Sequence, residues 1–259
     1  MITNFHTHVY PDNIAKKAIE SVSGYYGIKM EMDGSIQSLL TDCKKAGVDR
    51  AVVLGVATVP SQVQSINNYV ASLCNEHKEL VGFGTIHSEM ENPEAEIERM
   101  ISLGLKGVKI HPDTQHINID EEKMFKVYDM IRGKLPILFH CGDYRYGYSR
   151  PESLARVLDN FPGLTVIAAH FGGWSLWDLA AEYLVDRDCY LDCSSSTMYL
   201  GRKRSRELIH EYGAERILFG TDFPMWNAFG EIGRIKDLNL SAEETELIMN
   251  GNASRILGE

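Results

Sequence analysis

Ile2-Thr3-Asn4-Phe5-His6-Thr7-His8-Val9 is a short apolar stretch with two histidines close to its end. Successive side chains of a β-strand point to opposite faces, so His6 and His8 would present their rings on the same side. Two imidazoles with this spacing can coordinate one metal ion. We therefore predict that the chain begins with a strand whose carboxyl end carries metal ligands.

Seven more runs rich in Val, Ile, Leu and Phe follow along the chain, and longer segments with helical apolar spacing separate them. Most of these runs are continuously apolar, which is typical of the strands of a parallel sheet that is covered by helices. With the first stretch, the predicted strands are Ile2–Val9, Arg50–Val56, Leu80–Ile86, Gly107–His111, Pro136–His140, Thr165–His170, Cys189–Cys193 and Arg216–Asp222.

The intervening segments carry helix signals. Asn92-Pro93-Glu94 places proline in a first turn, and Asp120-Glu121-Glu122 places acids at a positive helix end. Eight such units fit 259 residues, the usual size of one barrel. We predict an α/β fold, a (β/α)8 TIM barrel, as a single domain over residues 1–259. A doubly wound open sheet is the alternative. Such a fold would call for a G-x-G-x-x-G turn after an early strand, and this sequence has none.

The amino-acid composition limits the kinds of partner that we expect for this protein. The net charge of −10 disfavours nucleic acid, and the basic run 202–206 is expected to be a solvated helix face. No apolar run is long enough for a bilayer, and the first residues lack the features of a secretory signal. We expect a cytoplasmic protein. The five scattered cysteines lack a C-x-x-C pair, so reduced thiols are expected.

Residues of metal-ligand type end most of the apolar runs. In a (β/α)8 barrel the active site lies at the carboxyl ends of the strands. A single strand-end histidine is more often a satisfied or solvent-facing imidazole, but several at one barrel end indicate a site. Neutral imidazole and carboxylate suit Zn²⁺, and Mn²⁺ or Fe²⁺ could use the same ligands. The strand-end residues are His6, His8, His111, His140, His170 and Asp222.

Six motifs, spread in order along the whole chain, carry a family resemblance. They are Phe5-His6-Thr7-His8, Gly107-Val108-Lys109-Ile110-His111-Pro112, His140-x-Gly142, Ala169-His170-Phe171-Gly172-Gly173, Gly220-Thr221-Asp222-Phe223-Pro224 and Asn252-Ala253-Ser254-Arg255-Ile256-Leu257. In these motifs the chain resembles the amidohydrolase superfamily, specifically the amidohydrolase-related branch that contains aminocarboxymuconate semialdehyde decarboxylase. The resemblance implies a barrel of the metal-dependent hydrolase type.

The resemblance also implies roles for individual residues. His6, His8, His140 and Asp222 would be the ligands of one divalent ion, for which we expect Zn²⁺, with Mn²⁺ or Fe²⁺ as alternatives. Asp222 could also receive a proton, and His170 would stand beside the activated water as a base or orienting group. The late Asn252-Ala253-Ser254-Arg255 is expected to be structural.

Two positions raise questions of detail. The branch usually begins Asp-x-His-x-His, whereas this chain has Asn4, a departure that concerns a supporting hydrogen bond rather than the ligands. Two-metal members of the wider superfamily use a carbamylated lysine on strand four as a bridge. The branch pattern favours one metal, so we expect Lys109 to serve substrate contact or structure.

The segment after the fifth run, Asp143–Pro151, contains three tyrosines and two arginines. An arginine fork matches a carboxylate and tyrosine rings offer stacking area, so this loop could hold an anionic or aromatic substrate. The alternative is a surface loop with packed tyrosines. Trp174 and Trp226 suggest an aromatic rim, whereas Trp177 has the setting of a core residue. The candidate substrate-binding residues are Lys109, His111, Tyr144, Arg145, Arg150 and Trp174.

Two reactions are compatible with such a site. The first is hydrolysis of an amide, ester or lactone bond in a small organic substrate through a metal-activated water, with His170 and Asp222 as catalytic residues. The second is decarboxylation of a small aromatic or unsaturated carboxylic acid, which needs an arginine to place the carboxylate. We favour hydrolysis, because it is the commoner chemistry of the superfamily and the chain lacks the longer insertions of the decarboxylases.

Other functions fit the sequence less well. A non-catalytic metal-binding barrel would need a blocked coordination position or a displaced His170, and neither defect is visible in the sequence. A nuclease of related fold would favour a glutamate on strand four and a basic cleft, whereas this chain has Lys109 and an acidic balance. The expected partner is a small-molecule substrate, without nucleic acid or membrane. Many members of the branch are dimers, so a homodimer is consistent with the resemblance.

Overall fold

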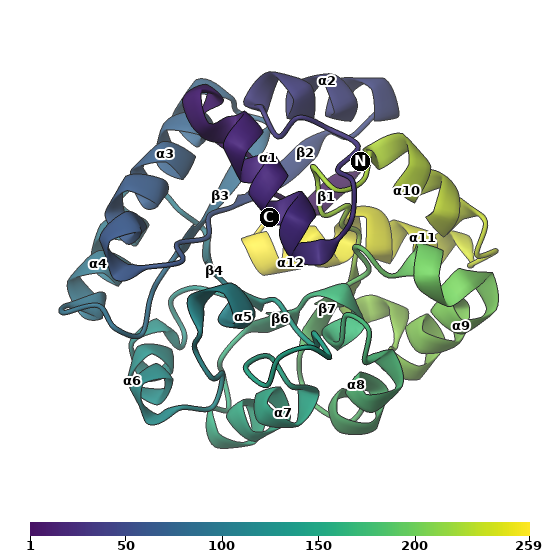
Figure 1. The fold of residues 1–259 in the computed structure, drawn as a ribbon. Coiled ribbons are helices and arrows are strands. Elements are labelled where there is room, and N and C mark those ends of the chain that lie inside the picture. Colours follow the sequence, from purple (N-terminus) through teal and green to yellow (C-terminus); the bar gives the residue numbers. More distant parts are fainter.

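The computed structural model describes residues 1–259, and at its centre lies a sheet of eight parallel strands in sequence order (Figure 1). Hydrogen bonds from Phe5 N to Phe219 O at 2.7 Å and from Asp222 N to His6 O at 2.9 Å join the last strand segment to the first. The predicted (β/α)8 barrel is therefore confirmed. The strands are β1 (Thr3–Thr7), β2 (Arg50–Leu54), β3 (Leu80–Thr85), β4 (Gly107–Ile110), β5 (Ile137–Phe139), β6 (Val166–Ala168), β7 (Tyr190–Asp192) and β8 (Ile217–Leu218).

Helices surround this sheet, and none of them has the length and apolar character that would let it cross a membrane. They are α1 (Asp12–Tyr26), α2 (Ile36–Ala46), α3 (Val63–Glu76), α4 (Pro93–Ser102), α5 (Pro112–Gln115), α6 (Glu122–Ile131), α7 (Pro151–Asn160), α8 (Trp177–Leu184), α9 (Thr197–Tyr212), α10 (Ala228–Lys236), α11 (Ala242–Glu246) and α12 (Asn252–Leu257). Short helical turns lie at η1 (Pro60–Gln62), η2 (His170–Gly172), η3 (Ala214–Arg216) and η4 (Leu247–Gly251).

All eight predicted strands are present, and each ends before its predicted carboxyl end. After β6 and β8 the reason is that ligand-type residues leave the sheet to form turns. His170 (φ 60°) and Asp222 (φ 62°) adopt left-handed backbone conformations, which cannot continue a strand. Such conformations are unfavourable for residues other than glycine and gather at functional sites. The backbone thus turns sharply where the candidate site begins.

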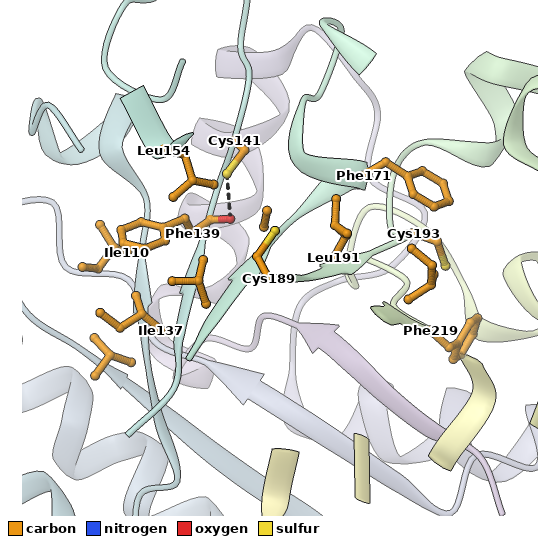
Figure 2. Close-up of a cluster of buried hydrophobic side chains, with 14 of the residues drawn as sticks. Ile110, Ile137, Phe139, Cys141, Leu154, Phe171, Cys189, Leu191, Cys193 and Phe219 are labelled. Carbon is orange, nitrogen blue, oxygen red and sulfur yellow. Dashed lines mark hydrogen bonds between the residues drawn. The ribbon is translucent and has the colours of Figure 1, made fainter. Parts of the chain in front are cut away.

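The apolar residues form two layers. A small inner cluster fills the barrel and includes Phe5, Phe83 and Leu138, with Ala253 of α12 packed against it at the amino ends of the strands. The larger cluster lies between the outer face of the sheet and the helices, and Figure 2 shows part of it around Phe139. Alternation along the strands places successive side chains in these two layers.

A register shift in β1 determines the direction in which the side chains of His6 and His8 point. Asn4 pairs with Ala51 while Thr7 pairs with Val53, so β1 contains one extra residue relative to β2. A bulge of this kind re-aims side chains. Phe5 therefore joins the inner apolar cluster, whereas His6 and His8 both line the cavity at the carboxyl end of the barrel. Simple alternation from Phe5 would not have placed all three inside.

Helix α1 lies across the open end of the barrel (Figure 1). Only Ala15 of this helix is fully buried, and its last two turns bring Tyr25 and Tyr26 to the cavity wall. One helix per strand is predicted, whereas the segment between β1 and β2 holds two helices, and the first of them is this cover. A helix in this position narrows access to the strand ends.

Three local expectations agree with the structure. Helix α4 begins after Asn92, whose side chain accepts a hydrogen bond from Ala95 N. The five cysteines are free thiols. The basic run 202–206 lies in α9, where Arg204 pairs with Asp178 and Glu211.

The packing around β5 gives a stability prediction. Phe139 is fully buried and its ring contacts Tyr128 edge-on, with 5.8 Å between centroids. We expect Phe139→Ala to lower the free energy of unfolding by about 3–5 kcal/mol, because the cavity removes apolar burial and contacts. Denaturant unfolding followed by circular dichroism would measure it. Tyr144→Ala is the control, since Tyr144 is 65% exposed. Equal losses in both variants would contradict this account of the core.

Candidate active site

A cavity of about 400 Å³ opens at the carboxyl ends of the strands, beneath α1. Its walls combine polar strand-end residues with side chains from α1, among them Tyr26, and from the loop after β8, among them Met225. The sequence-predicted residues that line it are His6, His8, Lys109, His111, His140, His170 and Asp222. The strands thus bring residues that are far apart in sequence together in one cavity, as expected of a barrel.

His6, His8 and Asp222 form one group of potential metal ligands. The Nε2 atoms of His6 and His8 lie 3.2 Å apart. Asp222 Oδ1 lies 3.5 Å from His6 Nε2 and 3.8 Å from His8 Nε2. One ligand atom from each residue therefore falls within 4.8 Å of the other two. Two imidazoles and a carboxylate are a donor set that suits a catalytic divalent ion.

Hydrogen bonds at Nδ1 leave the Nε2 atoms of both histidines available. His6 Nδ1 lies 2.8 Å from Asp192 Oδ2, and His8 Nδ1 lies 3.0 Å from Leu54 O. These acceptors fix the proton on Nδ1, so each Nε2 carries a lone pair directed toward the group. The tautomers therefore fit metal coordination.

Asp222 is held by neighbours on two sides. Ser195 Oγ donates to Asp222 Oδ2 at 2.6 Å and itself accepts from Trp226 Nε1 at 3.0 Å. Asn4 receives a hydrogen bond from Thr221 N at 3.0 Å and donates to Thr221 Oγ1 at 2.9 Å. Asn4 thus ties β1 to the turn that carries Asp222.

His140 and His170 form a second pair. His170 Nδ1 lies 3.1 Å from Ser194 O, which accepts a hydrogen and leaves the lone pair on Nε2. His170 Nε2 lies 3.1 Å from His140 Nδ1, while His140 Nε2 is buried without a hydrogen-bond partner. The ligand atoms of His140 group with His111 and Asp113 rather than with His6, His8 and Asp222.

Burial keeps several of these groups neutral. It lowers the pKa of His8 to about 3 and that of His170 to about 4, so both imidazoles are uncharged near pH 7. Neutral imidazole is the form that binds a metal or accepts a proton. Burial also lowers the pKa of Lys109 to about 8, and its Nζ lies 3.4 Å from His6 Nε2.

The carboxylates of the site behave differently. Burial alone would raise the pKa of Asp222, but His6, His170 and His8 together hold it below its usual range. The same opposition, with His6 as the main neighbour, lowers the pKa of Asp192. At Asp113 burial is not offset in this way, and it raises the pKa to about 6. The site therefore contains two firmly ionised carboxylates beside its histidines.

The structure places the predicted substrate-binding residues in two sets. Lys109 and His111 line the cavity, whereas the other four do not. Arg145 is occupied by Asp143, with Nη2 at 2.6 Å from Oδ2, and by Tyr25 O at 2.6 Å. Arg150 pairs with Glu152 at 2.9 Å.

The two aromatic candidates also lie off the cavity wall. Tyr144 is 65% exposed to solvent. The ring of Trp174 packs edge-on against Tyr26, with 5.4 Å between their centroids. Trp174 thus packs against the last residue of α1.

Several residues of the site were not found by sequence reasoning. Asp192 is the last residue of β7 and the last but one of the predicted run Cys189–Cys193, and this place near a strand end could have marked it. Asp113 lies in the first turn of α5 and Ser195 in the loop after β7, and only the fold brings both to the site. Tyr26 belongs to α1, and His116 is a further residue that lines the cavity.

The amidohydrolase family model matches residues 4–258, so the chain belongs to the amidohydrolase family, whose members are metal-dependent enzymes. A comparison with curated protein sequences found no match.

Solved structures share the fold across nearly the whole chain. The 5-carboxyvanillate decarboxylase of Sphingomonas paucimobilis is 17% identical, with a TM-score of 0.75 over 99% of this chain and 98% of that one. The dihydroxybenzoic acid decarboxylase of Polaromonas sp. JS666, which has bound manganese, is 15% identical, with a TM-score of 0.77 over 99% and 96%. A probable 2-pyrone-4,6-dicarboxylic acid hydrolase of Acinetobacter baumannii is 15% identical, with a TM-score of 0.72 over 100% and 99%.

Proposed function

We propose that this amidohydrolase is a metal-dependent hydrolase that cleaves an amide, ester or lactone bond in a small organic substrate. The observation that carries the proposal is the group of His6, His8 and Asp222, whose ligand atoms lie within 4.8 Å of one another at the base of the cavity. This donor set suits Zn²⁺, with Mn²⁺ or Fe²⁺ as alternatives. His140, whose Nε2 has no partner, is the fourth proposed ligand.

A bound divalent ion would supply Lewis acidity, which activates a water molecule or polarises a substrate oxygen. The chain's own groups manage the protons. His170 lines the cavity and is neutral near pH 7, and its Nε2 lies 3.1 Å from His140 Nδ1; in this proposal His170 gives up that contact and accepts a proton from the attacking water. Asp222 can receive a proton at its carboxylate, while Ser195 keeps that carboxylate oriented.

The cations around the cavity favour hydrolysis over decarboxylation. A substrate carboxylate would need an arginine or lysine to place it, and Lys109 is the only such residue in the cavity wall. Lys109 is fully buried and directed at His6. Arg145 and Arg150 are engaged with carboxylates outside the cavity. Decarboxylation is the second candidate, supported by the neighbours named as aromatic acid decarboxylases.

A single screen tests the proposal. Lactones, amides, esters and aromatic carboxylic acids are incubated with the metal-loaded enzyme, while acid release and CO2 release are recorded side by side. We expect acid release from one of the first three classes and no CO2. CO2 release from an aromatic acid, without hydrolysis of any ester, lactone or amide, would replace the hydrolase with the decarboxylase.

Asp192 gives a prediction about metal affinity. Its Oδ2 accepts from His6 Nδ1, and its Oδ1 accepts from His170 N and Ser194 N. An asparagine side chain at this position would offer one acceptor oxygen and one donor, so it would lose one of these contacts. We expect Asp192→Asn to weaken metal binding by about 10- to 100-fold.

Competition with a fluorescent zinc chelator would measure the affinity. Asp178→Asn is the matched control, because Asp178 pairs with Arg204 on the surface and its side chain is 85% exposed. Equal affinity in the two variants would show that Asp192 does not support the His6 ligand.

A further inference from the structure

A second polar group lines the same cavity and has no role in the proposed hydrolysis. His111 and Asp113 are 8% and 1% exposed, and both follow β4 directly. His111 Nδ1 and Asp113 Oδ1 are buried without a hydrogen-bond partner. A buried polar atom left unpaired is unfavourable, so these atoms are expected to be paired by what the cavity binds.

The geometry argues against a second metal ion here, although His111, Asp113 and His140 have suitable ligand atoms within 4.8 Å of one another. The rings of His111 and His140 are stacked, with 4.0 Å between centroids and 9° between planes. An imidazole lone pair lies in the plane of its ring, so an ion must lie near that plane. One ion cannot lie in two parallel, separated planes. The group is therefore better suited to hydrogen bonding.

Asp113 is oriented before any ligand arrives. Ser149 Oγ donates to Asp113 Oδ2 at 2.6 Å and is itself held by Gly142 N at 3.1 Å. Asp113 lies in the first turn of α5, and Gln115 of the same turn bonds His111 N at 2.8 Å and Ala57 O at 2.9 Å. One carboxylate oxygen is thus fixed by the protein, whereas Oδ1 of this cavity-lining residue has no hydrogen-bond partner.

The charges around Asp113 determine which chemical groups of a substrate can bind there. Asp113 forms no ion pair with lysine or arginine, and its nearest basic neighbour is His140, 3.7 Å from Oδ2. Among the residues that line the cavity, Lys109 is the one lysine or arginine, and its Nζ lies 3.4 Å from His6 Nε2 rather than beside Asp113. A substrate carboxylate here would face Asp113 without a compensating cation. A hydroxyl or an amide N–H would satisfy the free oxygen.

Tyr26 completes the wall. Its hydroxyl lies 2.7 Å from His111 Nε2 and holds that ring from the side of α1. The polar group is therefore built from β4, α5 and the helix that covers the mouth, and its parts are fixed by contacts within the protein.

We propose that Asp113 Oδ1, with His111 beside it, is a substrate-recognition subsite that binds a hydrogen-bond donor carried near the scissile bond. This inference rests on the proposed hydrolase function and narrows its substrate. The substrate is a small, uncharged ester, lactone or amide bearing a hydroxyl or amide N–H, and not a carboxylate at that position.

The test uses three probes that share one ring: γ-butyrolactone and its α-hydroxy and α-acetamido derivatives. We expect the metal-loaded enzyme to show kcat/KM about 10- to 100-fold higher for the two donor-bearing lactones, as a hydrogen bond to a charged acceptor provides. Asp113→Asn should reduce this preference to less than about threefold. Ser149→Ala, which leaves the carboxylate charged but less oriented, should give an intermediate preference. Glu152→Gln, a carboxylate change outside the cavity, should preserve it.

The outcomes separate the subsite from the reaction. Hydrolysis of all three lactones with equal kcat/KM would overturn the subsite and leave the hydrolase standing. If no lactone is cleaved, calorimetric titration of the same probes decides the subsite: tighter binding of the donor-bearing probes, lost in Asp113→Asn, supports it. Equal binding or no binding overturns it. Should Asp113→Asn fail to fold by circular dichroism, Ser149→Ala carries the same comparison.

Discussion

The protein is expected to carry about one tightly held divalent ion per chain when purified without added metal, and to lose activity when a chelator removes it. The rate should fall by about 10³-fold or more, because a metal ion contributes several kcal/mol of charge stabilisation to hydrolysis. Zn²⁺ or Mn²⁺ added back should restore the rate. Elemental analysis and kinetics on the same samples would check both parts.

Variants of the ligand group sharpen this prediction. His6→Asn and Asp222→Asn should lose the ion and the activity together, since the ligand atoms of both residues meet with that of His8. His210→Asn is the control, because His210 lies on the surface, where it pairs with Glu244. Metal content near zero in the unmodified protein would contradict the prediction. A content near two would show that Lys109 bridges a second ion.

His170→Asn is expected to keep the metal and the fold and to slow hydrolysis by about 10²- to 10⁴-fold. Asparagine is close to histidine in size and can donate to Ser194 O as the His170 ring does. It cannot accept a proton near neutral pH, so the step that needs a base should slow. Single-turnover kinetics and metal analysis on the same preparation would measure the effect.

His140→Asn provides the contrast, because the proposed role of His140 is that of a ligand. It should lower metal occupancy, and its activity should recover partly as the metal concentration is raised. If His170→Asn loses the ion while His140→Asn retains it, the roles of the two histidines are reversed. If His170→Asn stays fully active, the base lies elsewhere, with Asp222 as the next candidate.

The carboxyl ends of the strands were the most predictable part of the molecule. Continuous apolar runs identify buried parallel strands, and a barrel brings their carboxyl ends together whatever the sequence between them. His6, His8, His111, His140, His170 and Asp222 could therefore be assigned to one cavity from their positions alone, and all of them line it. Strand lengths were less predictable, because left-handed residues such as His170 and Asp222 end the sheet early.

Loop residues could not be placed in the same way. Arg145 and Arg150 follow β5 closely and have the chemistry of carboxylate binding, yet each is paired with a carboxylate outside the cavity. Asp143 and Glu152, the partners that hold them, lie only two residues away in sequence, but which way an arginine turns depends on the packing around it. The rings of Tyr25 and Tyr146 beside Arg145 belong to that packing.

The barrel, the end that holds the cavity and the residue types of the proposed metal site are predictable from the amino-acid sequence, because they follow from strand periodicity and from one rule of topology. The cover that α1 forms, the hydrogen bond between Asp192 and His6, and the unpaired oxygen of Asp113 are known from the folded structure alone. These features rest on contacts between segments far apart in sequence, such as His6 with Asp192 and Tyr26 with His111. Their energies depend on burial and distance, which exist only once the chain has folded.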